Sequence, residues 1–388
     1  RLKMKQLTRL FIPICLETLF YMLSGMVDTL MLSAVGDYAV GAVGTANSYI
    51  GIFIIMFSII SSGMVSVMTQ NIGAGRPGVA YQARQLGLLF NAVAGVLMAV
   101  FLFSGAGAIL RMVGIADALY EPAVIYLKIV GGGCILNAVI PIFSSYLRAF
   151  GYTKQPLYAT IVGNIANFVM NAVFLFVLHK GVAGVAAATV ISKILNLCIV
   201  LYFSHKLISA KNSTERIANK TVLGQIVKVG LPSACETALY NVAMMLVIRF
   251  LNQMDAEGLN VTARSYTATI SNFSYCVGAA LAQANAIMTG WHIGAGELEE
   301  CDRGTKRAAF VGVCVAVCME TAIVLGSGFI MPLFTDNPEM TALVRKLLAI
   351  DIVLEIGRVT NLVFGQALKT SGDAVFPAVI AAVFMFVF

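Results

Sequence analysis

Charged side chains are scarce in this sequence. Asp, Glu, Lys and Arg together make up 12% of its 388 residues, whereas a soluble globular chain carries about 25%. Hydrophobic residues make up 59%, and no stretch shows the charged face that a soluble domain presents to water. The low charge excludes a string of soluble domains and predicts a protein that crosses the membrane several times.

Residues that form catalytic or metal-binding motifs are also scarce. The only histidines, His179, His205 and His292, lie far apart, and no nucleophile–base pattern accompanies them. The eight cysteines are scattered, without a CxxC or Cys/His metal spacing. We therefore expect neither an enzyme nor a bound cofactor. The net charge of +7 indicates a basic surface against anionic lipid; without a basic groove lined by aromatics, no nucleic-acid partner is expected.

Long apolar runs dominate what is present. A run of about 20 residues can cross the hydrocarbon layer as a helix. We expect such helices at residues 10–33, 45–71, 85–112, 122–148, 157–178, 182–205, 224–252, 264–290, 307–331 and 341–368, with an eleventh from 375 to the end. The predicted fold class is an all-α integral membrane protein whose given sequence ends in helix 11.

The basic residues predict the orientation. The N-terminus and the loops after every second helix hold 17 of the 26 Lys and Arg residues, and the opposite loops hold seven. Because positive residues stay on the cytoplasmic side, we expect a cytoplasmic N-terminus in a multi-pass protein of the cell membrane.

The two halves of the sequence resemble each other. Three segments of the first half recur in order in the second half, shifted by 219 to 221 positions. The pairs are LFIPICLETLFY at 10–21 and VGLPSACETALY at 229–240, IGAG at 72–75 and 293–296, and LRAFG at 147–151 and LKTSG at 368–372. Six crossings per repeat bring both halves into the membrane from the same side.

This repeat predicts the architecture. Two six-helix bundles would be related by a pseudo-two-fold axis along the membrane normal, with a cleft between them, as in many transporters. We expect an N-terminal lobe at 1–210 and a truncated C-terminal lobe, helices 7 to 11, at 211–388. We expect a monomer that handles small organic substrates within the lipid bilayer.

Several motifs resemble those of the multidrug and toxic compound extrusion (MATE) transporters. They are Pro13 with MVDT at 26–29, QNIGAG at 70–75, LRAFGYTKQP at 147–156 and GVAGVAAAT at 181–189. The resemblance implies twelve helices in two bundles, alternating access, and export of organic, often cationic compounds driven by H⁺ or Na⁺. It is closer to the proton-coupled, DinF-like branch, because NorM-like members carry acidic residues where this sequence has Tyr240 and Arg358.

Asp28 is the most conspicuous polar residue of the first half. A carboxylate in a membrane helix is costly and is usually functional. Asn167 and Asn171 share one helix face, and Thr189 follows a Gly/Ala-rich segment that permits close helix packing. Together these four offer oxygen ligands for a proton relay or, if the protein is Na⁺-coupled, for a metal ion. The alternative is that the amides only join helices.

The MATE resemblance places the first-lobe ion-coupling site at the same four residues. The second half has no acid at the position that matches Asp28, whereas Glu17 has a counterpart in Glu236. We therefore expect Asp28 to be the coupling residue, and Glu17 and Glu236 to have structural roles near helix starts.

A second set of polar residues lies in the second half. Glu320, Asp351, Glu355 and Arg358 would form either a buried ion-pair network or a contact for substrate or protons. Tyr21 and Tyr240, at matching repeat positions, are further candidates for substrate contact.

The predicted function is that of a secondary antiporter. Burial disfavours the ionised form of Asp28, so a proton from outside neutralises it and releases its partners. Helix one then repacks, and an organic cationic or amphipathic substrate leaves in exchange for H⁺. Two alternatives stay open: Na⁺ coupling through the same pocket, and a lipid-linked oligosaccharide flippase of the same superfamily.

Overall fold

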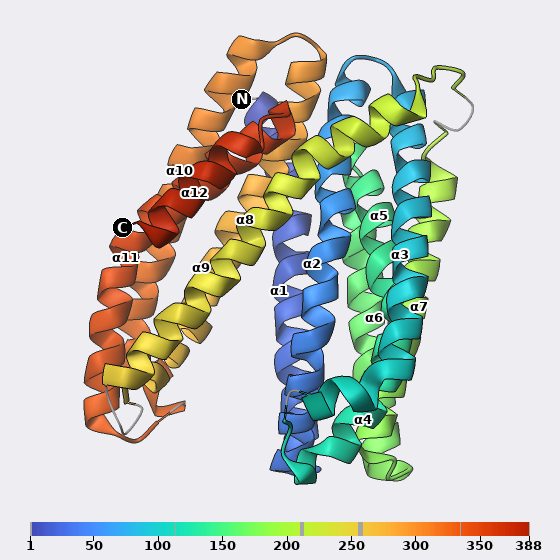
Figure 1. The fold of residues 1–388 in the computed structure, drawn as a ribbon. Helices are drawn as coiled ribbons and strands as arrows, with labels where there is room; N and C mark the ends of the chain where they lie inside the picture. Colours follow the sequence, from blue (N-terminus) through green and yellow to red (C-terminus); the bar gives the residue numbers. More distant parts are fainter. Residues whose placement is uncertain (1, 113, 210–212, 255–258, 334, 388) are drawn as a thin grey trace.

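Helices make up all the regular secondary structure that a computed structural model describes for residues 2–112, 114–209, 213–254, 259–333 and 335–387 (Figure 1). In chain order they are α1 (Leu2–Ser33), α2 (Asp37–Gly73), α3 (Pro77–Met112), α4 (Asp117–Gly132), α5 (Cys134–Ala149), α6 (Lys154–Ala172), α7 (Gly181–Leu207), α8 (Asn219–Met254), α9 (Leu259–Gly294), α10 (Leu298–Ile330), α11 (Pro338–Ser371) and α12 (Val375–Phe386). The predicted fold class is confirmed.

Most of these helices suit a bilayer. In the described part of the chain, seven are long and apolar enough to cross a membrane, and the count becomes eight if α4 and α5 form one span. Helices α9 and α11 fall outside this set because they carry more polar residues, many of them buried against other helices. The length and hydropathy of single helices thus identify fewer crossings than the sequence pattern predicts.

The predicted fourth helix is broken. Helices α4 and α5 meet at Gly133 with a bend of 41°. The break lies in a run of three glycines, residues 131–133, which have no side chains to stiffen the helix. Hydropathy did not reveal this bend because both halves are equally apolar.

Helix α1 extends beyond its apolar run. It begins at Leu2 and ends at Ser33, so Asp28 lies only five residues before its end. Asp28 therefore lies in the last third of the helix, not near its middle. The apolar run marked the membrane-embedded part of the helix, whereas the backbone hydrogen bonds continue through the polar start.

The repeat is visible in matching turns. Gly75, which follows α2, has φ 73°, and Gly296, which follows α9, has φ 79°. The next backbone N–H in each turn, at Arg76 and Glu297, donates to the carbonyl five residues earlier at 2.8 Å. Such a turn needs a left-handed residue, which favours glycine. The recurring IGAG segments thus fold identically.

Two contacts between the halves are related by the same repeat. The Gln70 side-chain N–H donates to the Thr370 carbonyl at 2.6 Å. The Trp291 indole N–H donates to the Ala149 carbonyl at 2.9 Å. Gln70 and Trp291 are 221 positions apart, as are Ala149 and Thr370. This exchange of partners is what a pseudo-two-fold relation between the halves requires.

The same end of the molecule brings α2 and α9 into close contact. A Cβ atom on Gly73 would collide with the backbone of Trp291, and one on Gly294 would collide with the backbone of Gln70. Ser66 adds a hydrogen bond to the Thr370 carbonyl at 2.7 Å. The halves are therefore closed against each other where the α2–α3 and α9–α10 turns lie.

The first helix of each half packs, at its start, against the other half. Leu7, Leu10 and Ile14 of α1 are buried with residues of α9, α10 and α11. Val222 and Ile226 of α8 are buried with residues of α2, α3 and α5. Figure 1 shows α8 running obliquely across the front of α2. The division into lobes at residue 210 stays a prediction.

We predict that Gly294→Ala destabilises the closed contact, because the added methyl meets a backbone carbonyl that cannot rotate away. Overpacking of this kind costs roughly 1–3 kcal/mol, so the thermal unfolding midpoint in detergent should fall. Gly304→Ala on α10 is the matched control, since nothing lies near its added methyl. An equal effect of both substitutions would contradict the close approach.

Candidate functional site

Asp28 lies at the centre of a polar cluster formed by α1, α6 and α7. The Asn171 side-chain N–H donates to Asp28 Oδ1 at 2.7 Å and lies 3.0 Å from Asn167 Oδ1. Both asparagines are buried, and Asp28 is half-buried. Three of the four predicted first-lobe residues are thus joined by hydrogen bonds.

Thr189 lies at the edge of this cluster. Its hydroxyl donates to the Val185 carbonyl of its own helix at 2.9 Å. Its backbone carbonyl accepts from Ser192, whose hydroxyl lies 3.5 Å from Asn167. Thr189 is therefore linked to the asparagines through Ser192, and it has no direct hydrogen bond to Asp28 among the described contacts.

Two further side chains face Asp28. Lys193 of α7 and Tyr126 of α4 both interact with the Asp28 carboxylate electrostatically. Lys193 also donates to Asn137 Oδ1 at 2.7 Å, while the Tyr126 hydroxyl interacts with Thr189. The site therefore contains an acid and a base that interact electrostatically, each hydrogen-bonded to a different asparagine.

Sequence reasoning missed Ser192, Lys193 and Tyr126 as members of this cluster. A lysine inside an apolar helix is itself an indication of function, and Lys193 lies one turn beyond Thr189. Tyr126 gave no such signal, because a tyrosine in a membrane helix is common at the interface.

The backbone beside the cluster is irregular. Asn171 lies at the end of α6, and a π-helical segment, Val173–Val177, follows directly. The Leu178 N–H donates to the Val173 carbonyl five residues earlier at 2.9 Å. π-Helical turns occur often at functional sites. This turn lets the chain reach α7 while the Asn171 amide stays directed toward α1.

Two repeat-related ion pairs join the middle of the first helix of each half to the last turn of a distant helix, α5 or α11. Arg148 Nη2 lies 2.6 Å from Glu17 Oε2, and Lys369 Nζ lies 2.8 Å from Glu236 Oε2. All four side chains are largely buried. The ion pairs agree with the structural role expected for both glutamates. The expected place near helix starts is wrong, because Glu17 and Glu236 lie near the middle of α1 and α8.

The second predicted set is brought together between α10 and α11. Arg358 pairs with Glu355 and lies 3.2 Å from Asp351. The Glu320 carboxyl faces Asp351 and Glu355 from α10, and one oxygen of each acid lies within 4.8 Å of the other two. Arg358 is therefore paired with both acids of its own helix.

Tyr21 and Tyr240 are accessible. Tyr21 of α1 is 72% exposed and Tyr240 of α8 is 50% exposed, at matching positions of the two halves. Tyr275 of α9 interacts with both Tyr240 and Arg358. A molecule that contacts Tyr240 is thereby close to the edge of the second polar cluster.

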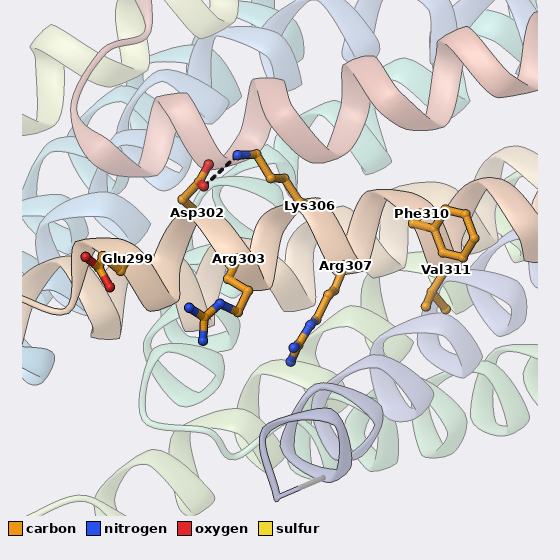
Figure 2. Close-up of a pocket in the computed structure, with 7 residues that line it drawn as sticks. All are labelled: Glu299, Asp302, Arg303, Lys306, Arg307, Phe310 and Val311. Carbon is orange, nitrogen blue, oxygen red and sulfur yellow. Dashed lines mark hydrogen bonds and ion pairs between the residues drawn. The ribbon is translucent and has the colours of Figure 1, made fainter.

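A surface pocket along one end of α10 lies away from both clusters. Figure 2 shows Arg303 and Arg307 pointing to one side of the helix and the Asp302–Lys306 pair to the other. That pair is separated by 2.7 Å and exposed. Its charges are those of a solvated helix face, and we assign it no role in binding.

The fold and the intramembrane polar site define a multi-pass membrane protein with two repeat-related halves. The MatE family model matches residues 13–173 and 232–388. The uncharacterized transporter YisQ of Bacillus subtilis (strain 168) is 32% identical over 379 residues, which cover 96% of this chain and 83% of that protein. The chain therefore belongs to the MATE family of transporters.

Solved structures agree on the fold. A crystal structure of MATE in the straight conformation has a TM-score of 0.88 at 21% identity, over 99% of this chain and 86% of that chain. An outward-facing multidrug resistance MATE family transporter of the MOP superfamily has a TM-score of 0.87 at 20% identity, over the same shares. The helices of this chain thus follow the MATE arrangement.

We predict that Asn171→Ala and Asp28→Ala are not additive in stability, because each removes the same hydrogen bond. A hydrogen bond to a charged group contributes about 1.5–3 kcal/mol, so Asn171→Ala should lower the unfolding midpoint less in the Asp28→Ala background. Asn164→Ala serves as control, since this amide donates to the Phe20 carbonyl instead. Additive effects of the first pair would show that the bond does not form.

Proposed function

We propose that this chain is a secondary antiporter that exports organic cationic or amphipathic compounds from the cytoplasm in exchange for H⁺. The observation that carries the proposal is the short hydrogen bond between Asp28 and Asn171, within a network of amides and hydroxyls inside a membrane protein. Membership of the MATE family supports the export of small organic molecules.

The contacts of Asp28 suggest how protonation changes the site. Ionised Asp28 accepts the Asn171 N–H and attracts Lys193. A proton on the carboxyl removes the negative charge, weakens the bond to Asn171 and leaves Lys193 without its counter-charge. Helix α1 then loses its polar anchor to α6 and repacks. The change in the shape of the first half lowers the affinity for substrate.

The position of the closed contact supports outward access in this conformation. The α2–α3 and α9–α10 turns, where the halves meet, belong to the side that is rich in Lys and Arg. By the positive-inside rule that side is cytoplasmic in the cell membrane. A monomer closed there can take up a proton from outside before it opens inward.

Proton movement across the membrane supplies enough free energy to export substrate against its concentration gradient. One proton crossing a potential of ~100 mV releases ~2.3 kcal/mol, and one pH unit adds ~1.4 kcal/mol. A free energy of 1.4 kcal/mol corresponds to about tenfold in concentration. One or two protons per cycle thus sustain roughly tenfold to thousandfold substrate gradients.

Na⁺ is the alternative coupling ion. Asn171 Oδ1 is buried beside Asp28 and has no hydrogen-bond partner among the described residues. With Asp28 and Asn167 it offers three oxygen ligands of the kind that hard cations bind. Lys193 argues against Na⁺ coupling, because its cationic side chain interacts with Asp28 and would compete with a bound Na⁺.

The test is transport in proteoliposomes with independently imposed gradients. We expect the wild-type chain to export a cationic dye when only a pH gradient is present, and Asp28→Asn to reduce export to the rate of empty liposomes. Asp37→Asn, nine positions further along and exposed, should leave transport unchanged.

Two outcomes would contradict the proposal. Unchanged pH-driven export by Asp28→Asn would remove Asp28 from the coupling step. Export that needs a sodium gradient, and persists when the pH gradient is collapsed, would replace H⁺ by Na⁺ as the coupling ion.

A further inference from the structure

Arg84 of α3 is a buried cation without an acidic partner. The residue is 6% exposed, and its Nε atom is buried with no hydrogen-bond partner in the described part of the chain. Arg148, Lys369 and Arg358 also lie among the helices, but each forms an ion pair with a glutamate. The only hydrogen bond of Arg84 among the described contacts is to the Ser204 hydroxyl of α7, at 3.5 Å. A buried charge without a counter-charge is costly, so Arg84 needs an explanation.

Three aromatic rings surround the Arg84 guanidinium. Its Cζ atom lies 4.5 Å from the ring centroid of Tyr81, 5.5 Å from that of Phe143 and 5.0 Å from that of Tyr146. Cation–π attraction offsets part of the charge, but it leaves the Nε donor without an acceptor. The Tyr146 hydroxyl, which interacts with Arg84 electrostatically, is also buried and has no hydrogen-bond partner among the described residues. Two donors thus lie close together inside the protein with nothing to accept their hydrogens.

A second arginine reaches the same rings from the connection between α7 and α8. Arg216 Cζ lies 5.3 Å from the ring centroid of Tyr81, and its guanidinium donates to a backbone carbonyl at the start of α3. The groups that interact electrostatically with Tyr146 are Arg84, Tyr81 and Arg216, and none of them is an acid. Glu215, the neighbouring acid, is exposed and forms no ion pair with either arginine among the described contacts. The two guanidinium groups repel each other, so an anion between them would stabilise the arrangement.

The second half has no equivalent of this arginine pair. The position that the repeat relates to Arg84 holds Thr305. Thr305 lies in a neutral cluster, in which the Asn285 side-chain N–H donates to it at 3.3 Å and the Thr289 hydroxyl lies 3.5 Å away. Neutral hydroxyl and amide groups therefore suffice for the packing of the bundle at this place. An arginine is not required by the fold there, which favours a binding role for Arg84.

These residues lie near one end of the helices that carry them. Arg84 is the eighth residue of α3, about 10 Å along the axis from the helix start. Tyr146 and Ser204 lie in the last turns of α5 and α7. This end of the molecule carries the turns rich in Lys and Arg, and the positive-inside rule makes it cytoplasmic. Anionic lipids of the cytoplasmic leaflet attract basic segments, and basic pockets between transmembrane helices on that side bind lipid head groups.

We propose that these two arginines, with the Tyr146 and Ser204 hydroxyls, bind one phosphate group, supplied by an anionic lipid headgroup or by a soluble phosphate. Arginine binds phosphate oxygens through a fixed fork of N–H donors, and the Tyr146 hydroxyl adds a donor that otherwise has no acceptor. Arg216 is exposed, so a phosphate can reach the site past it. The site shares no residue with the Asp28 cluster and is independent of the proposed coupling step.

A bound phosphate would join α3, α5 and α7 to the connection that leads to α8. A ligand that binds only the folded state stabilises it by mass action, so we expect the thermal midpoint to rise with added ligand. Tyr146→Phe keeps the ring and removes only the hydroxyl. Because that hydroxyl is unpaired without a ligand, the substitution should not lower the midpoint of the ligand-free protein. It should reduce the rise that the ligand causes, which a tyrosine with a packing role alone would not do.

The experiment is thermal unfolding of the purified full chain in detergent at constant ionic strength, with added phosphatidylglycerol, phosphatidylcholine or inorganic phosphate. We expect a saturable rise of the midpoint with phosphatidylglycerol or with inorganic phosphate, and a smaller rise with phosphatidylcholine, whose headgroup has no net charge. A rise with phosphatidylglycerol alone identifies a lipid headgroup as the ligand, and a rise with inorganic phosphate identifies a soluble phosphate. Arg84→Gln should weaken the apparent affinity roughly tenfold or more, because charge-assisted hydrogen bonds are lost.

Further variants separate this site from other causes. Arg216→Gln should also weaken the affinity, and it tests the site if Arg84→Gln fails to fold. Arg303→Gln is the matched control, since Arg303 is an exposed arginine near the start of α10, and Asp28→Asn should leave the rise unchanged even if it abolishes transport. The proposal is overturned if neither phosphatidylglycerol nor inorganic phosphate raises the wild-type midpoint, or if Arg216→Gln and Tyr146→Phe respond as the wild-type chain does.

Discussion

The cost of placing a charge inside an apolar helix bundle is the constraint on which this structure depends. A carboxylate at membrane depth costs several kcal/mol unless it has partners. The chain meets this cost in three ways: ion pairs for Glu17 and Glu236, an amide network with a nearby lysine for Asp28, and one arginine shared by Asp351 and Glu355. The first is structural and occurs twice, whereas the other two occur once each.

That difference connects the repeat to the proposed function. The halves share the same turns, glycine contacts and ion pairs. These features hold the helices of each half together, and the glycine contacts bring the two halves together at one end. They differ in their interior charges, with one acid facing a lysine in the first half and three acids facing an arginine in the second. The two bundles are thus built alike but differ in interior charge, and the proposed coupling step uses only the charge of the first half.

Much of this could be predicted from the sequence, and the reasons are specific. Self-similarity predicted the repeat, and helical periodicity placed Asn167 and Asn171 on one face, which the hydrogen bonds of α6 confirm. The bend at Gly133 and the contact of Lys193 with Asp28 were not predictable. The three glycines at 131–133 and the lysine in an apolar helix are visible in the sequence, but the angle of the bend and the nearness of Lys193 to Asp28 depend on how α4 and α7 pack. The pairing of Glu17 with Arg148 likewise joins residues 131 positions apart.

The most direct test of the central claim is whether substrate binding displaces a proton from Asp28. Binding of a cationic substrate to the detergent-solubilised protein would be followed with a pH indicator in weak buffer. Because coupling between two ligands is reciprocal, the account predicts about one proton released per substrate bound by the wild-type chain, and none by Asp28→Asn. Equal release by both proteins, or no release by the wild-type chain, would contradict it.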